Sequence, residues 1–190
     1  TAAAIASQMN RYPDIANTEM TYALSRRLGV PAEQFAFGTG SVGVLYHLLQ
    51  ATCEPGDEVV YAWRSFQAYP IATAVTGATP VPVPLGPGAV HDLDSMRRAV
   101  TPATKAIMLC TPNNPTGPAL QHQRVIDFID SLPDHIMIVL DEAYVEFVTD
   151  PQALRGLEVM VGRPNVVVLR TFSKAYGLAG FRVGYCVADA

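Results

Sequence analysis

Apolar residues along the chain form short continuous runs, separated by segments in which apolar positions recur at helical spacing. The runs predict seven strands, at 35–37, 58–62, 79–85, 105–110, 136–144, 165–174 and 181–188. The segments between them predict helices at 18–28, from 41 onward, and at 66–75, 94–100 and 121–132. Continuous apolar strands that alternate with helices indicate a sheet covered on both faces, and therefore an α/β fold. Prolines in 79–85 indicate that this strand lies at an edge or is short.

Turn and cap signals refine this organisation. Residues 1–17 read as a polar, mostly irregular N-terminal arm, and 18–190 as one domain with a single core. Gly29 and Pro31 end the first helix. Ser41 and Asp94 are each expected to cap the helix that follows them.

Polar residues gather where three of the predicted strands end. The strand at 105–110 runs into TPNNPTG, the next ends in DEAY, and the third ends in TFSK. In α/β sheets, ligands bind at the carboxyl ends of the strands. We therefore expect the three ends to form one site.

The chain has two lysines, Lys105 and Lys174, so any lysine chemistry must use one of them. Lys105 fits a surface lysine that opens a strand after a turn. Lys174 lies among hydroxyls and small residues, with Arg182 eight positions later. Partial desolvation or a nearby cation turns a lysine into a nucleophile toward carbonyl groups, and Lys174 is the better candidate for that role.

Two other polar positions leave the choice between structure and chemistry open. Asp141 follows three apolar residues, where a carboxylate is costly unless it is paired. It is either a structural acid bound by backbone donors or the counter-ion of a cationic ligand, and Tyr144 could face the same pocket. Asn114, in a proline-rich turn, is either a loop residue or a rigid donor to a ligand oxygen.

The GTGS segment at 38–41 precedes a helix, and helix N-termini favour phosphate groups. Alone it is weak evidence. It is not a nucleotide-binding P-loop, because no Gly-Lys-Ser/Thr follows, and it lacks the full dinucleotide-binding spacing.

Composition excludes several classes of function. The formal net charge is −4 and no run of lysine or arginine occurs, which argues against nucleic acid or an anionic membrane as a partner. No apolar stretch approaches the roughly 20 residues of a membrane helix, and no secretory leader is visible. Three widely spaced cysteines read as buried thiols in a reducing, cytoplasmic compartment rather than as disulfides or metal ligands.

Taken in order, the motifs RYPD, GTGS, WRSFQAYP, PNNPTG, DEAYVEF and TFSKAYGLAGFRVG resemble the fold-type I pyridoxal-phosphate (PLP) aminotransferases, and they cover Arg11 to Gly184. The resemblance implies a three-layer α/β/α domain around a mostly parallel seven-stranded sheet. Within that family the chain looks most like the histidinol-phosphate and aromatic aminotransferase branch. GSVG and WRSFQAYP look like the actinobacterial aromatic (phenylalanine) enzymes.

The resemblance also implies roles for individual residues. Lys174 would hold PLP as a Schiff base and move the proton, and Asp141 would pair with the protonated pyridine nitrogen. Tyr144 and Asn114 would contact the phenolic oxygen, and Phe66 would stack on the ring. The phosphate would be bound by Ser41, the Val42 amide, Thr171, Ser173 and Arg182. Tyr12 would reach the phosphate of a neighbouring subunit, which implies a homodimer.

The implied reaction transfers an amino group between an aromatic amino acid and 2-oxoglutarate, without a metal. Histidinol-phosphate aminotransferase is the alternative with the same chemistry, and a PLP lyase or acyltransferase is a more distant one. The C-terminal small domain of the family, with its substrate-carboxylate arginine, is missing from the sequence. A catalytically silent PLP-binding or dimerising remnant is therefore the alternative from another class.

Overall fold

A computed structural model describes residues 10–190, and the chain divides into two units after Phe35. The first unit contains helix α2 (Thr18–Leu28), which ends at Gly29 in the left-handed region with φ 68°. Its amide donates to the Ser25 carbonyl oxygen, which satisfies the last turn. The helix predicted at 18–28 forms with those bounds.

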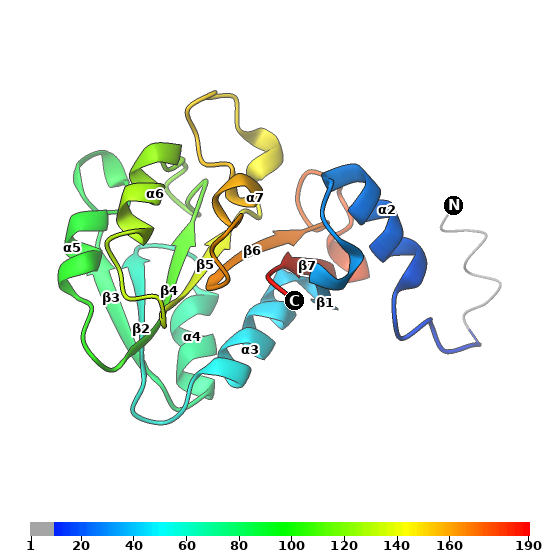
Figure 1. The fold of residues 1–190 in the computed structure, drawn as a ribbon, viewed down its shortest axis with the longest axis horizontal. Coiled ribbons are helices and arrows are strands. Elements are labelled where there is room, and N and C mark those ends of the chain that lie inside the picture. The colour runs from blue at the N-terminus through cyan, green and yellow to red at the C-terminus, as the bar shows by residue number, and fades with distance from the viewer. Residues whose placement is uncertain (1–9) are drawn as a thin grey trace. The chain divides into compact units, whose positions relative to one another are not determined.

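The second unit, 36–190, is organised around a seven-stranded sheet with the order β1-β7-β6-β5-β4-β2-β3 (Figure 1). The strands are β1 (Phe35–Thr39), β2 (Glu58–Trp63), β3 (Thr79–Pro84), β4 (Thr104–Cys110), β5 (Met137–Asp141), β6 (Val166–Thr171) and β7 (Val183–Val187). The pairs from β3 through β6 are parallel and β7 runs antiparallel to β6. The expected α/β fold and mostly parallel sheet are confirmed, with β3 at an edge.

Helices cover both faces of this sheet, as Figure 1 shows. Helices α3 (Gly40–Thr52) and α4 (Ala68–Val75) lie on one face. On the other are α5 (Leu93–Arg98) and α6 (His122–Ile129), with the short α7 (Gly156–Val159) against β6. No helix within residues 10–190 is long and apolar enough to cross a membrane.

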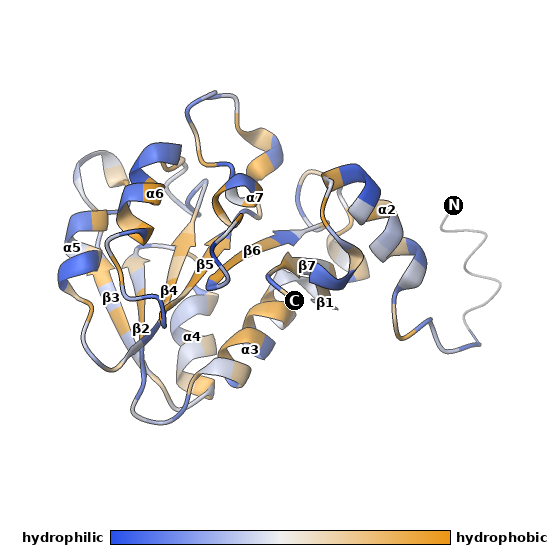
Figure 2. Cartoon of the chain, viewed as in Figure 1, coloured by the Kyte–Doolittle hydropathy of each residue, from blue (hydrophilic) through white to orange (hydrophobic). Residues whose placement is uncertain are grey.

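The continuous apolar runs arise because the central strands are buried on both faces. Met108 and Val139 belong to the core that α3 and α4 cover, while their neighbours Ile107 and Ile138 are equally inaccessible. In Figure 2 the strands are mostly orange, which marks hydrophobic residues. The helices outside them carry blue, hydrophilic segments. Burial of apolar surface is the main stabilising contribution to the fold. The packed strands in turn hold in place the polar motifs that follow their carboxyl ends.

Both helix caps expected from the sequence were wrong by two residues. The N-cap of α3 is Thr39, with no side-chain hydrogen bond, and Ser41 lies inside the first turn. The cap of α5 is Asp92, whose carboxylate accepts from the Ser95 amide, and not Asp94. The side-chain oxygen must reach the amide two or three positions ahead, and Asp94 is already helical. The first turn of α3 therefore keeps its amides free of a side-chain cap.

Candidate functional site

A cavity of about 170 Å³ opens where β4, β5 and β6 end. Ten of the eleven residues nominated from the sequence line it, joined by Cys110 and Ala143. The three strands are neighbours and parallel, so their carboxyl ends meet at one edge, as predicted. The remaining nominee, Tyr12, belongs to the N-terminal unit and is fully exposed.

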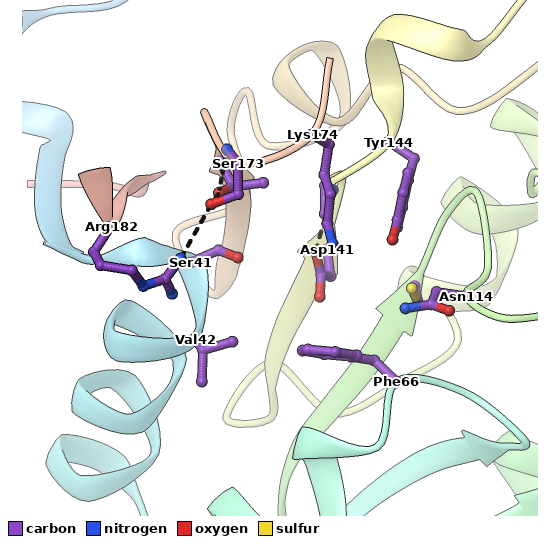
Figure 3. A pocket seen from close by; sticks show the side chains of 12 residues that line it. Ser41, Val42, Phe66, Asn114, Asp141, Tyr144, Ser173, Lys174 and Arg182 are labelled. Atoms are coloured by element: carbon purple, nitrogen blue, oxygen red, sulfur yellow. Dashed lines mark hydrogen bonds between the residues drawn. The ribbon is translucent and has the colours of Figure 1, made fainter. Parts of the chain in front are cut away.

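One end of the cavity gathers donors suited to an anion. Ser41 and Val42 come from the first turn of α3, and Ser173 and Arg182 face them in Figure 3. Arg182 Nη1 donates to Ser173 Oγ at 3.4 Å and to the Ala179 carbonyl oxygen at 2.9 Å. An uncapped helix start, hydroxyls and a guanidinium together favour a phosphate or carboxylate.

Thr171 holds Ser173 in place at the anion-binding end of the cavity. It is 4% exposed, its hydroxyl donates to Ser173 Oγ at 3.0 Å, and it accepts from the Ser173 amide at 3.1 Å. These bonds fix the orientation of Ser173 and leave Thr171 little freedom for a ligand of its own.

Gly40 lets the arginine approach the start of α3. It adopts φ 79°, and a Cβ placed there would collide with the guanidinium of Arg182. Arg182 itself has φ 54°, and its carbonyl oxygen accepts from the Gly40 amide at 2.9 Å. The glycine is thus required both by its backbone conformation and by the closeness of the side chain.

Asp141 is the deepest charged group of the cavity. It is 3% exposed, and its two oxygens accept from the Tyr69 hydroxyl at 2.8 Å and the Ala143 amide at 3.2 Å. Burial raises the pKa of Asp141 to about 6, against the opposing effect of these two donors. A buried carboxylate with a raised pKa favours a cation brought by a ligand.

Lys174 and Tyr144 occupy the side of the cavity above Asp141. The ammonium nitrogen Nζ lies 5.2 Å from the centroid of the Tyr144 ring. In Figure 3 the lysine extends toward Asp141, while Asn114 and Phe66 bound the cavity on the side away from Arg182. An amine, a phenol and an amide therefore surround the space over the carboxylate, and the anion-binding end lies apart from them.

Two contributors escaped the sequence interpretation. Cys110 lines the cavity and pairs in register with Asp141. Burial, reinforced by the charge of Asp141, raises the pKa of the Cys110 thiol to about 12, so it stays protonated. Tyr69 is fully buried, where it donates to Asp141 and packs edge-on against Phe66 at a ring-centroid distance of 5.8 Å. Spacing along the chain gives no signal for a bond between residues 72 positions apart.

Trp63, Phe66 and Tyr69 form an aromatic cluster with Tyr61 beside the cavity. Of Trp63, Phe66 and Tyr69, only Phe66 lines the cavity. The other two pack with Tyr61, at ring-centroid distances of 6.1 and 6.0 Å. Their edge-to-face contacts stabilise the α4 side of the core and add no surface for a substrate.

Glu142 follows Asp141 but serves the opposite face of the sheet. Its carboxylate forms an ion pair with Arg170 at 2.7 Å and accepts from the Gly156 amide at 2.7 Å. Successive strand residues point to opposite faces, so DEAY contains one acid for the cavity and one for structure. Within residues 10–190 no cluster of three or more potential metal ligands occurs.

Comparison with known proteins agrees with this geometry. Residues 2–190 match the family model of class I and II aminotransferases. Aromatic amino acid aminotransferases from Streptomyces avermitilis and Streptomyces coelicolor are 58% and 55% identical, over 94% and 99% of this chain. The chain spans about half the length of these curated relatives, 50% and 52% respectively.

Solved structures give the same result for the fold. Histidinol-phosphate aminotransferase from Sinorhizobium meliloti, in complex with pyridoxal-5′-phosphate, superposes with a TM-score of 0.92 at 34% identity. The match covers 98% of this chain and 50% of that one. An aspartate aminotransferase variant from Thermus thermophilus follows at a TM-score of 0.85 and 28% identity, over 98% of this chain and 54% of that one. The chain therefore belongs to the class I and II aminotransferase family.

Proposed function

We propose that the chain is the cofactor-binding part of a PLP-dependent aromatic amino acid aminotransferase. The observation that carries the proposal is the single cavity in which Lys174, Asp141 and an anion-binding end occur together. When bound, PLP supplies an electron sink for charge that develops at the substrate α-carbon.

The residues present fit this cofactor. PLP carries a phosphate, a ring nitrogen that can be protonated, a phenolic oxygen and an aldehyde. Ser41, Ser173 and Arg182 suit the phosphate, and buried Asp141 suits a protonated ring nitrogen. Asn114 and Tyr144 can donate to the phenolic oxygen, and Phe66 supplies a flat apolar face.

The positions of these residues around the cavity suggest a role for each of them. Lys174 would supply the amine that holds the cofactor's aldehyde group, and it would act as the base that moves a proton at the substrate α-carbon. Asp141 would pair with the ring nitrogen and favour its protonated form. Val42 lines the cavity at the start of α3, where its amide can donate to the phosphate. Thr171 holds Ser173 in place.

The aromatic substrate class is supported by the relatives and by the charge of the cavity. Relatives at 58% and 55% identity are named aromatic amino acid aminotransferases. Arg182 is the one arginine among the described residues that line the cavity, and we assign it to the cofactor phosphate. Arg64 is instead exposed and stacks on Trp63 at 4.8 Å. Histidinol phosphate, the substrate of the alternative enzyme, would need a further cationic clamp.

The decisive experiment uses the purified full-length protein with PLP. Conversion of phenylalanine and tyrosine with 2-oxoglutarate is compared with conversion of histidinol phosphate through kcat/KM. We expect the aromatic amino acids to be preferred. A preference for histidinol phosphate above about tenfold, roughly 1.4 kcal/mol, would reverse the assignment. A cofactor absorbance that no amino acid changes would identify a silent PLP-binding protein.

We further propose a homodimer in which Tyr12 reaches the partner's cofactor phosphate. Tyr12 is fully exposed in the N-terminal unit, and exposed termini are poorly ordered unless another surface holds them. Sedimentation of the full-length protein and of Tyr12→Ala tests this idea. A fully active monomer would remove it.

A cytoplasmic location is proposed as well. Cys53, Cys110 and Cys186 are all buried and free, as expected for thiols kept in a reducing compartment. Fractionation of cells that produce the full-length protein checks this, and recovery of the protein outside the cytoplasm would contradict it.

A further inference from the structure

Asn113, the neighbour of the cavity residue Asn114, is a buried hydrogen-bond junction. It is 4% exposed. Its Nδ2 donates to the Arg64 carbonyl oxygen at 3.0 Å and to Thr116 Oγ1 at 2.7 Å. Its Oδ1 accepts from Ser65 Oγ at 2.7 Å and lies 3.2 Å from His91 Nε2. All four hydrogen-bonding positions of the amide are used.

These partners fix the protonation of His91. The Arg64 carbonyl can only accept, so the Asn113 amide cannot be rotated and its Oδ1 must face His91. His91 then carries its proton on Nε2 and donates it. Its Nδ1 is left buried without a hydrogen-bond partner, the one such side-chain atom within residues 10–190. A buried ring nitrogen without a hydrogen-bond partner destabilises the folded state, so a histidine is an unfavourable choice for filling space alone. The role of His91 is therefore its hydrogen bond through Nε2.

The junction ties two walls of the cavity together. Phe66 and Asn114 line the cavity from different loops. Ser65 directly precedes Phe66, and Asn113 directly precedes Asn114. The backbone of Asn113 also closes its own loop, through bonds to Pro118 at 2.9 Å and Gly117 at 2.8 Å. A displaced Asn113 would therefore move the amide and the aromatic face on that side of the ligand at the same time.

We propose that His91 is a positioning residue for this site, which holds Asn113 through Nε2 and so sets Asn114 and Phe66 relative to each other. The proposal rests on the proposed function insofar as the ligand is PLP. His91 does not line the cavity, so it acts only through Asn113.

The test compares PLP affinity of the full-length apoprotein among matched variants. His91→Leu removes the donor and should weaken binding roughly tenfold, about the effect of one hydrogen bond to a buried partner. His91→Gln keeps an N–H donor and should restore binding to within about threefold. His135→Leu, at an exposed histidine before β5, should leave it unchanged.

A double-mutant cycle decides whether the effect runs through the junction. In an Asn113→Ala background, His91→Leu should produce no further loss of affinity, because the partner is already gone. Additive losses, or unchanged binding in His91→Leu, would overturn the proposal.

A readout without cofactor separates this proposal from the function on which it rests. In the apoprotein, His91→Leu should speed hydrogen exchange of the Asn113 and Gly117 amides roughly tenfold relative to the amides of β5. Equal exchange in both proteins sinks the positioning role even if PLP binds. A wild-type protein that fails to bind PLP sinks the proposed function, while the exchange data still decide the role of His91.

Discussion

The Tyr69 hydroxyl donates a 2.8 Å hydrogen bond to Asp141 Oδ2 from the first turn of α4, inside the core. The phenol is fully buried, and burial, reinforced by the charge of Asp141, raises the pKa of Tyr69 well above its ordinary value, so it remains a donor. This bond is one of two that orient the carboxylate toward the cavity.

Tyr69→Phe is expected to raise the pKa of Asp141 further, because the hydroxyl is a donor that favours the charged carboxylate. The loss of a bond to a charged group is worth about 1.5–3 kcal/mol, and PLP affinity should fall accordingly. Titration of Asp141 by NMR in the full-length apoprotein measures the shift. Tyr61→Phe, in the same aromatic cluster but without contact to Asp141, is the control. Equal titration of Asp141 in all three proteins would contradict the prediction.

Asp141 should make the apoprotein less stable as pH rises. The folded pKa is about 6 and the ordinary value 3.8, so the folded state holds the proton more tightly. The stabilising effect of the protonated form is present below pH 3.8 and is lost by about pH 6. Two units correspond to about 3 kcal/mol. Denaturant unfolding of wild type and Asp141→Asn between pH 4 and 7 measures the difference, with exposed Asp134→Asn as control. A pH-independent difference between the two proteins would show that Asp141 is not the group involved.

The two lysines give a direct test of the chemistry. Lys174→Ala should lose the absorbance of the covalently bound cofactor and all transamination. Lys105→Ala should keep both, because Lys105 lies near the N-terminal end of β4, whereas the cavity lies where that strand ends. Borohydride reduction followed by peptide mapping checks the assignment, and a trapped cofactor on Lys105 would refute it.

Gly40→Ala tests the anion-binding end. A methyl group there would displace the Arg182 guanidinium, and the backbone at φ 79° is strained for alanine. PLP should lose roughly tenfold or more in affinity, while pyridoxal, which lacks the phosphate, should lose much less. Comparing the two ligands in the same variant separates a local effect from unfolding. Equal losses for both would place the phosphate elsewhere.

The sequence predicted the fold and the residues that gather around the cavity, because both depend on local pattern. Apolar runs located the strands, and parallel pairing brought TPNNPTG, DEAY and TFSK to one edge. Side-chain partners remote in sequence were not predictable. Asn113 and Asn114 look equivalent in the motif, yet one is a buried junction and the other lines the cavity.

The helix caps illustrate the same limit at short range. Thr39, Ser41, Asp92 and Asp94 are all acceptable cap residues, and only the backbone path selects between them. The N-cap of α3, Thr39, makes no side-chain hydrogen bond to the first turn. The sequence predicted Ser41 as the cap, so it did not reveal that the first-turn amides have no side-chain cap.

Edge strand β3 bears on the solubility of the protein. The amides of Thr79 and Leu85 donate to β2 and its loop, so alternate residues of this strand direct their nitrogens inward. Pro80, Pro82 and Pro84 occupy the other positions, where a nitrogen would face outward and now carries no hydrogen. A strand from another molecule would find no N–H donor at these three positions, and the edge is thereby protected against intermolecular pairing and aggregation.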